Sequence, residues 1–401
     1  MREAARESLL NIDETAPLLM SFENLALLSD EAEAQRRRVS AGTNTAEDEA
    51  AVLLRLDRLL ELMQRVGEED DWLAIAKAGD FRVVRAVFNH WSANCPPSVR
   101  LVVCRNLVLF FKLVPDAVLR VACGPGGFSF AGDDGGGSDG GGAEPVESEK
   151  SIVFVLEQML DGLKEAKAME GDELREMREE AVTVWMILAE SMFAEWQRCG
   201  IAEEELPHRA LVSIMFDVLE GTDDFAYKAT ASAIIAANSH FGDRGANVVM
   251  MTLKTHKNKA LLAEAMLGQL NDLGYPNADT PSLRGKLRSL LQALEDVFVL
   301  PETADFFYVN DLNVLIDVVL RELTNLPMSD ELTCNYLQVL KQLLLNSQWF
   351  ARGDRYRRED ICAALESMHE AATEDETGEA NAEALELIDD LFEECYAILV
   401  E

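Results

Sequence analysis

Apolar residues recur along this chain with the spacing of a helix face. The clearest stripe has members at offsets of 0, 3, 4, 7, 8 and 11: Leu312, Leu315, Ile316, Val319, Leu320 and Leu323. Because successive helical residues are rotated by about 100°, these six side chains share one face. Val314 and Val318 widen the stripe, as expected of a helix contacted on two sides. The pattern predicts a helix over residues 310–325.

Capping residues and prolines indicate where such helices begin and end. Thr280 followed by Pro281 is typical of an N-cap and a first helical position, and Pro301 ends the helix that follows. Ser329, placed before Asp330, predicts the cap and first turn of another helix. The predicted helices are 17–28, 46–66, 80–93, 97–113, 149–167, 172–199, 205–220, 224–239, 258–273, 281–299, 310–325, 329–346, 358–371 and 380–400.

The number and spacing of these helices predict the fold class. No window alternates between apolar and polar residues with a period of two, so no strand is expected. The helices are joined by short polar turns and recur in pairs about every 40 residues, the period of armadillo and HEAT repeats. The prediction is an all-α, armadillo/HEAT-like helical solenoid. A large globular helical bundle is the alternative, because sequence identity between the units is weak.

A few segments interrupt the helical pattern. Residues 124–147 are rich in Gly and Asp, and they contain too little apolar surface to offset the entropy cost of ordering, so we expect a flexible insertion. Residues 371–382 are expected to form a mobile acidic link. Residues 1–45 are expected to form a partly flexible N-terminal lead-in or cap. The predicted organisation is this lead-in followed by a single armadillo-like helical domain at 46–401.

The charge balance narrows the class of partner. The chain has 72 acidic and 36 basic residues, a formal net charge of −36. Because such a surface repels phosphate groups, we expect no nucleic-acid partner and no binding to anionic membranes. The most apolar stretch, residues 101–114, is too short to span a bilayer, so no membrane insertion is expected. The seven cysteines are odd in number and widely spaced, which is typical of reduced core residues in a cytoplasmic protein.

No motif predicts an enzyme. The acidic run from Asp389 to Glu393 resembles the magnesium-binding motif of all-helical terpene synthases, but the sequence lacks the second motif that this chemistry needs. HExxH motifs, Walker loops and compact His/Cys clusters are absent from the sequence. We therefore expect no catalytic activity, no cofactor, no metal and no small-molecule substrate.

Basic side chains gather in three places against this acidic background, and we predict that one or more of these clusters binds a protein partner. Arginine in particular is favoured at protein interfaces, because its planar guanidinium pairs with carboxylates and stacks on aromatic rings. The alternative is local pairing with acidic neighbours such as Asp354, Glu359 and Asp360, which contributes little at a surface. The candidate residues are Lys254, Lys257 and Lys259; Arg284, Lys286 and Arg288; and Arg352, Arg355, Arg357 and Arg358.

A longer pattern in the C-terminal half resembles a known family. Residues 306–327 read FFYVNDLNVLIDVVLRELTNLP, and segments 336–340, 343–346 and 356–361 continue the pattern. This sequence is similar to the leucine-rich domain of the WISH/DIP family, which includes the mammalian SH3-protein interacting with Nck. The resemblance covers roughly residues 300–365.

The resemblance implies an armadillo-like fold and an activator of the actin-related protein 2/3 complex that needs no pre-existing filament. Such a protein binds the complex from the side, favours its filament-like arrangement and seeds linear actin filaments. It implies a cytoplasmic location at cortical actin sites and a connection with endocytosis. None of the 11 prolines forms a PxxP pair, so we expect no adaptor activity through SH3 partners. The alternative function is a passive helical-repeat scaffold that gathers regulatory proteins without activating them.

Overall fold

The computed structural model describes residues 103, 106–107, 149–168, 175–195, 208–220, 224–240, 247–303, 305–349, 356–374 and 379–399. These ranges contain 11 α-helices, one short 3-10 helix and no strand, which confirms the predicted all-α fold. The predicted lead-in at 1–45 and the glycine-rich insertion at 124–147 lie outside the described residues.

The chain divides into two compact units, Met1–Pro207 and His208–Glu401. In the first unit the described helices are α8 (Glu149–Ala168) and α9 (Arg175–Glu195), which pack against each other. A methyl group at Gly162 of α8 would overlap the Trp185 ring of α9, so glycine permits this close approach. The prediction of one helical domain over 46–401 stays a prediction, because much of the first unit lies outside the described residues.

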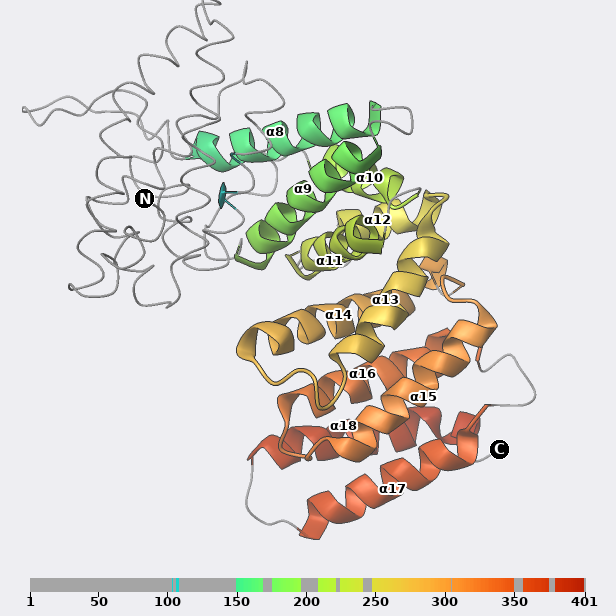
Figure 1. Ribbon diagram of the computed structural model, residues 1–401. Coiled ribbons are helices and arrows are strands. Elements are labelled where there is room, and N and C mark those ends of the chain that lie inside the picture. The colour runs from blue at the N-terminus through green and yellow to red at the C-terminus, as the bar shows by residue number, and fades with distance from the viewer. Residues whose placement is uncertain are drawn as a thin grey trace, which may run out of the picture. The chain divides into compact units, whose positions relative to one another are not determined.

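Helices of the second unit stack in two layers. One layer contains α13, α15 and α17, and the other contains α11, α14, α16 and α18, each helix contacting the next in its layer. Figure 1 shows α13, α15 and α17 side by side, with α14, α16 and α18 behind them. This is the layering of the predicted solenoid. The elements are α10 (His208–Val218), α11 (Asp224–His240), α12 (Val248–Thr255), α13 (Lys259–Leu273), α14 (Pro281–Val299), η4 (Pro301–Thr303), α15 (Val309–Asn325), α16 (Glu331–Asn346), α17 (Arg358–Glu374) and α18 (Glu379–Leu399).

The apolar stripe predicted for α15 forms part of the core. All six of its members are buried, and so is Val318. The expectation for Val314 was wrong: this side chain is 49% exposed. Val314 lies on the same helix face as Asn310 and Arg321, which are also exposed. Helix α15 packs against α13, α16 and α17, and these contacts leave that face open.

The capping residues at two helix starts were predicted with different success. Pro281 is the first residue of α14, and the Thr280 hydroxyl accepts a hydrogen bond from the Leu283 N–H at 3.3 Å, as expected of an N-cap. The N-cap of α16 is Asp330 and not Ser329. The Asp330 carboxylate accepts a hydrogen bond from the Leu332 N–H at 2.9 Å, and a carboxylate there also interacts favourably with the helix dipole.

Helix α12 is absent from the helices predicted from the sequence, and its start depends on a buried polar network. The Asn247 side-chain oxygen caps this helix by accepting hydrogen bonds from the Val249 and Met250 N–H groups. The Asn247 amide donates to Asn238 of α11 at 2.7 Å, and Asn238 donates to the Asp296 carboxylate of α14 at 2.8 Å. Because buried polar groups require partners, this network links α11, α12 and α14.

A buried carboxylate anchors the loop between α13 and α14. Glu322, near the end of α15, is 1% exposed and accepts a hydrogen bond from the Tyr275 N–H at 2.7 Å. It also pairs with Arg321 at 2.8 Å. Gly274 passes so close that a Cβ there would lie 2.5 Å from Glu322 Oε1 and 2.8 Å from Arg321 Nη2. Only glycine fits here without displacing the ion pair between Arg321 and Glu322.

We predict that Gly274→Ala lowers the free energy of unfolding by about 1–3 kcal/mol, because the new methyl group displaces a buried carboxylate from its partners. The matched control is Gly285→Ala in α14, where a Cβ meets nothing within 4 Å. This control is expected to raise stability by up to about 1 kcal/mol, the difference in helix propensity. Thermal melts of both variants provide the measurement, and a neutral Gly274→Ala would contradict the close contact.

Candidate protein interface

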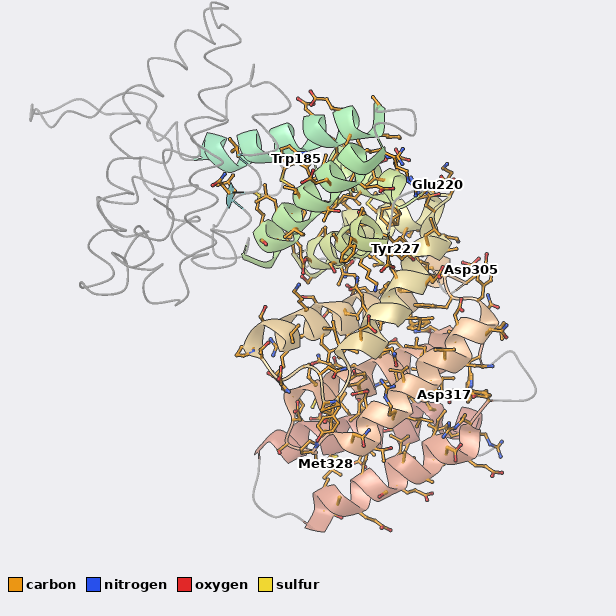
Figure 2. The ribbon with its side chains drawn as sticks, viewed as in Figure 1. Trp185, Glu220, Tyr227, Asp305, Asp317 and Met328 are labelled. Carbon is orange, nitrogen blue, oxygen red and sulfur yellow. The ribbon has the colours of Figure 1, made fainter. Side chains whose placement is uncertain are left out.

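Helix junctions of the second unit fall on two edges of the stack, because successive helices alternate in direction. Figure 2 shows Glu220, Asp305 and Asp317 along one side of this unit and Met328 toward the other. We call the first side the η4 edge and define it by these three carboxylates, the α12–α13 turn (256–258), η4 and Tyr308. The opposite edge contains the α13–α14 loop and the turn before α16.

The predicted lysine cluster lies on the η4 edge, where each lysine pairs with a carboxylate from another element. These pairs are Lys254 with Glu302 at 3.1 Å, Lys257 with Glu220 at 2.7 Å, and Lys259 with Asp305 at 3.5 Å. The hydrogen bond between Lys257 and Glu220 raises the pKa of the lysine and lowers the pKa of the carboxyl group. The cluster therefore presents neutralised pairs and not a free positive patch.

Part of the predicted arginine cluster also lies on this edge. Arg357 has a φ of 56°, a left-handed conformation that is uncommon for a residue with a side chain. Its guanidinium donates to Asp360 at 2.6 Å and to Asp317 of α15 at 2.9 Å. The Tyr356 hydroxyl also donates to Asp317 at 3.0 Å, and this hydrogen bond raises the pKa of the tyrosine. Arg358 begins α17.

Two other members of that cluster, Arg352 and Arg355, lie outside the described residues. Arg357 is held by Asp317 of α15 and by Asp360 of α17, and its pair with Asp360 agrees with the local-pairing alternative. Whether any of these cations contacts a partner stays a prediction.

The third basic cluster lies on the opposite edge, away from the other two. Arg284 donates to Asp330 at 2.5 Å and pairs with Glu331 at 3.8 Å, while Arg288 also pairs with Glu331. Lys286 lies between them on α14 and is exposed. These ion pairs connect the start of α14 to the start of α16. They join neighbouring helices of one layer, so the cluster has a structural role whether or not it binds a partner.

An exposed tyrosine on the η4 edge escaped the charge-based prediction. Phe306 and Phe307 are 3% and 0% exposed, whereas Tyr308, the N-cap residue of α15, is 69% exposed. The Phe307 ring stacks on Phe298 with centroids 5.6 Å apart and meets Phe306 edge-on at 4.8 Å. Two buried rings therefore anchor the backbone that presents Tyr308. The signal available in the sequence is the run of three aromatic residues at a helix start.

Tyrosine in this setting is typical of a protein interface. Its ring provides a large contact area at a low entropy cost, and tyrosine is enriched among the residues that contribute most to binding. Two ion pairs lie just before it along the chain, Glu302 with Lys254 and Asp305 with Lys259. The arrangement suits a contact whose centre is an aromatic side chain and whose rim is charged.

The described ranges contain neither a cluster of metal-binding side chains nor a helix that could cross a membrane. No three His, Cys, Asp or Glu side chains gather there as they would around a metal ion. Every helix in those ranges is too short or too polar to span a bilayer.

The family model described as "SPIN90/Ldb17, leucine-rich domain" matches residues 222–361. These residues are similar to the leucine-rich domain of the SPIN90/Ldb17 family. The resemblance to the WISH/DIP family is thereby confirmed. The matched range contains α11 to α16 and the first residues of α17. Tyr308 and all three basic clusters fall within it.

Fungal proteins are similar to parts of the chain. Protein dip1 of Schizosaccharomyces pombe is 50% identical over 66 residues, which are 15% of this chain and 17% of the relative. Protein LDB17 of Eremothecium gossypii is 25% identical over 217 residues, 51% of this chain and 45% of the relative. Protein LDB17 of Saccharomyces cerevisiae is 47% identical over 58 residues, 14% of this chain and 11% of the relative. The matches thus span less than half the length of each relative.

Proposed function

We propose that this chain binds the actin-related protein 2/3 complex and activates it without a pre-existing filament, so that linear actin filaments are seeded. The observation that carries the proposal is the SPIN90/Ldb17 domain at residues 222–361, because the family resemblance implies this activity. The 50% identity to protein dip1 over 66 residues supports it. We further propose that the η4 edge, with Tyr308 at its centre, contacts the complex.

Activation by binding places a physical requirement on the surface. A ligand shifts a conformational equilibrium only if it binds one state more tightly than the other. A surface that discriminates between states has to hold its shape, and a preordered surface loses less entropy on binding. The η4 edge has such order because the buried rings of Phe306 and Phe307 hold the backbone before Tyr308. Ion pairs from Lys254 to η4 and from Arg357 to α15 lie on the same edge. These contacts support a rigid binding edge.

In the proposed function the chain acts by binding alone, with no catalytic residue, no cofactor and no small-molecule substrate. We propose that it works in the cytoplasm, at cortical actin sites and in endocytosis. A passive scaffold that gathers regulatory proteins is the second candidate, and the helical stack suits it equally well. The two functions differ in whether the bound complex changes its activity.

We predict that the purified chain shortens the lag of pyrene-actin assembly when the actin-related protein 2/3 complex is present and filament seeds are absent. The products viewed by fluorescence microscopy are expected to be mostly unbranched. The chain alone and the complex alone serve as controls, and both are expected to keep the long lag. If the chain binds the complex but leaves the lag unchanged, the scaffold function replaces the proposed one.

We predict that Lys257→Glu on the η4 edge slows association with the complex a few-fold, and that the effect shrinks at high salt, as for a charge at the rim of an interface. Because Lys257 is 71% exposed, the change is expected to leave the melting temperature almost unaltered. Arg288→Glu on the opposite edge is the matched charge reversal and is expected to leave association unchanged. Stopped-flow or surface-binding kinetics at two salt concentrations provide the measurement; equal effects of the two reversals would remove the η4 edge as the contact.

A further inference from the structure

One dipeptide on the opposite edge has the features of a modification site. Thr280 and Pro281 form the only Ser-Pro or Thr-Pro pair in the 401 residues. Both residues are exposed, together with Asp279 before them and Ser282 after them. The Thr280 backbone is extended, with φ −105° and ψ 151°. Protein kinases bind the acceptor residue in an extended chain, and one large class requires proline directly after it.

The Thr280 hydroxyl is only weakly engaged in the fold. Its oxygen accepts a long hydrogen bond from the Leu283 N–H at 3.3 Å, which leaves the oxygen a second lone pair. The first turn of α14 is exposed at Pro281 and Ser282, and helix ends open readily. The loop before it is anchored through Tyr275 to Glu322. A kinase therefore needs to unwind only the first turn of α14, and the packed helices of the second unit stay in place.

A guanidinium lies one helical turn beyond the hydroxyl. Arg284 follows Thr280 by four residues, a spacing that places two side chains on the same helix face. Its Nη2 atom pairs with Asp330 at 2.5 Å and with Glu331 at 3.8 Å. A phosphate on Thr280 lies within reach of this arginine, and arginine is the side chain that pairs best with phosphate. The Arg284 guanidinium is thus positioned before Thr280 is phosphorylated.

We propose that Thr280 is a phosphorylation site for a proline-directed protein kinase and that Arg284 binds the phosphate. In the transfer, Thr280 Oγ forms a bond to the γ-phosphorus of ATP while the bond from that phosphorus to the β-phosphate oxygen breaks. ADP leaves, and the hydroxyl proton passes to the catalytic carboxylate of the kinase. The product adds about 1.5 to 2 negative charges to the loop that carries Tyr275, which is 55% exposed.

Phosphorylation changes the chemistry of the opposite edge in two ways. It adds a dianion to the loop that also carries the exposed Tyr275, which disfavours an acidic partner there and favours a basic one. It also competes with Asp330 for Arg284, and so alters an ion pair between α14 and α16. Phosphorylation of Thr280 depends on these residues alone and is independent of the proposed binding to the actin-related protein 2/3 complex.

The first test is phosphate transfer to the folded full-length chain. Wild type and Pro281→Ala are incubated with ATP and a mitogen-activated protein kinase, and peptide mass spectrometry locates the phosphate. The variant keeps the hydroxyl but lacks the proline, and its melting curve is checked beforehand. We expect Thr280 to be modified in wild type and at least about tenfold more slowly in Pro281→Ala, a difference of about 1.4 kcal/mol in the barrier. An unmodified Thr280 in folded wild type, or equal rates, would overturn the site.

The second test examines the role of Arg284 through the phosphate itself. The second pKa of phosphothreonine is about 6, and a bound guanidinium lowers it because it favours the dianion. Phosphorus NMR titration is expected to show a pKa lower by at least about half a unit in phosphorylated wild type than in phosphorylated Arg284→Gln. Arg288→Gln, one turn further on, is the matched control and is expected to behave as wild type. Equal pKa values in all three proteins would overturn the proposed Arg284–phosphate contact.

Discussion

Tyr308→Ala is expected to weaken binding to the actin-related protein 2/3 complex by about 30-fold or more, or about 2 kcal/mol. The side chain is 69% exposed in the free chain, so its burial against a partner removes a large apolar ring from water. The two phenylalanines before it are buried and hold its backbone. Little conformational entropy is then lost on binding, and most of the contact energy contributes to affinity.

Tyr275→Ala provides the matched control for this experiment. Tyr275 is 55% exposed but lies on the opposite edge, in the loop between α13 and α14. Its replacement is expected to leave affinity unchanged, and both variants are expected to melt like the wild type because neither side chain is in the core. Isothermal titration with purified complex measures the two affinities. Wild-type affinity of Tyr308→Ala would exclude this tyrosine as the centre of the contact.

Asn238→Ala is expected to lower the free energy of unfolding by about 2–6 kcal/mol, because it removes two buried hydrogen bonds at about 1–3 kcal/mol each. The Asn247 amide loses its acceptor, and the Asp296 carboxylate loses one of its donors. Both groups are almost inaccessible to water, at 0% and 2% exposure. Since Asn247 also caps α12, the effect is expected to extend to that helix.

Urea unfolding measures the loss of stability, and hydrogen exchange shows which helices lose protection. The control is Asn346→Ala at the exposed end of α16, where the amide donates only to Gln342; it is expected to cost less than about 0.5 kcal/mol. Amides of Val249 and Met250 are expected to exchange faster in Asn238→Ala, while those of α16 keep their protection. Unchanged exchange in α12 would show that the network does not hold this helix.

A link between this network and the proposed function follows from the position of α12. Lys254 in its last turn reaches Glu302 of η4, so a loosened α12 also loosens the η4 edge. Asn238→Ala is therefore expected to weaken binding to the complex as well as stability, although Asn238 itself is buried and cannot contact a partner. Gly274→Ala on the opposite edge, which is also expected to lower stability, separates this effect from general destabilisation: it is expected to leave binding to the complex unchanged.

Local chemistry was sufficient to predict most helices of the described part. The predicted range 281–299 coincides with α14, and 310–325 differs from α15 by one residue. An apolar stripe with helical period and a capping residue act within a few positions of each other, so they can be read along the sequence. The family pattern at 306–327 is likewise a continuous stretch of sequence, so it can be recognised without the structure.

Which side chains meet, and which edge they occupy, depended on contacts between distant parts of the chain. The cap of α12 is held through Asn238 and Asp296, 58 residues apart, so no local signal marks it. Lys257 and Glu220 lie 37 residues apart and Arg284 and Asp330 lie 46 apart, and only the alternating helix directions place these pairs on opposite edges. Tyr308 is exposed beside two buried phenylalanines because Phe298 of α14 stacks on Phe307. Burial and ion pairing are properties of the packed helices, and a linear pattern does not contain them.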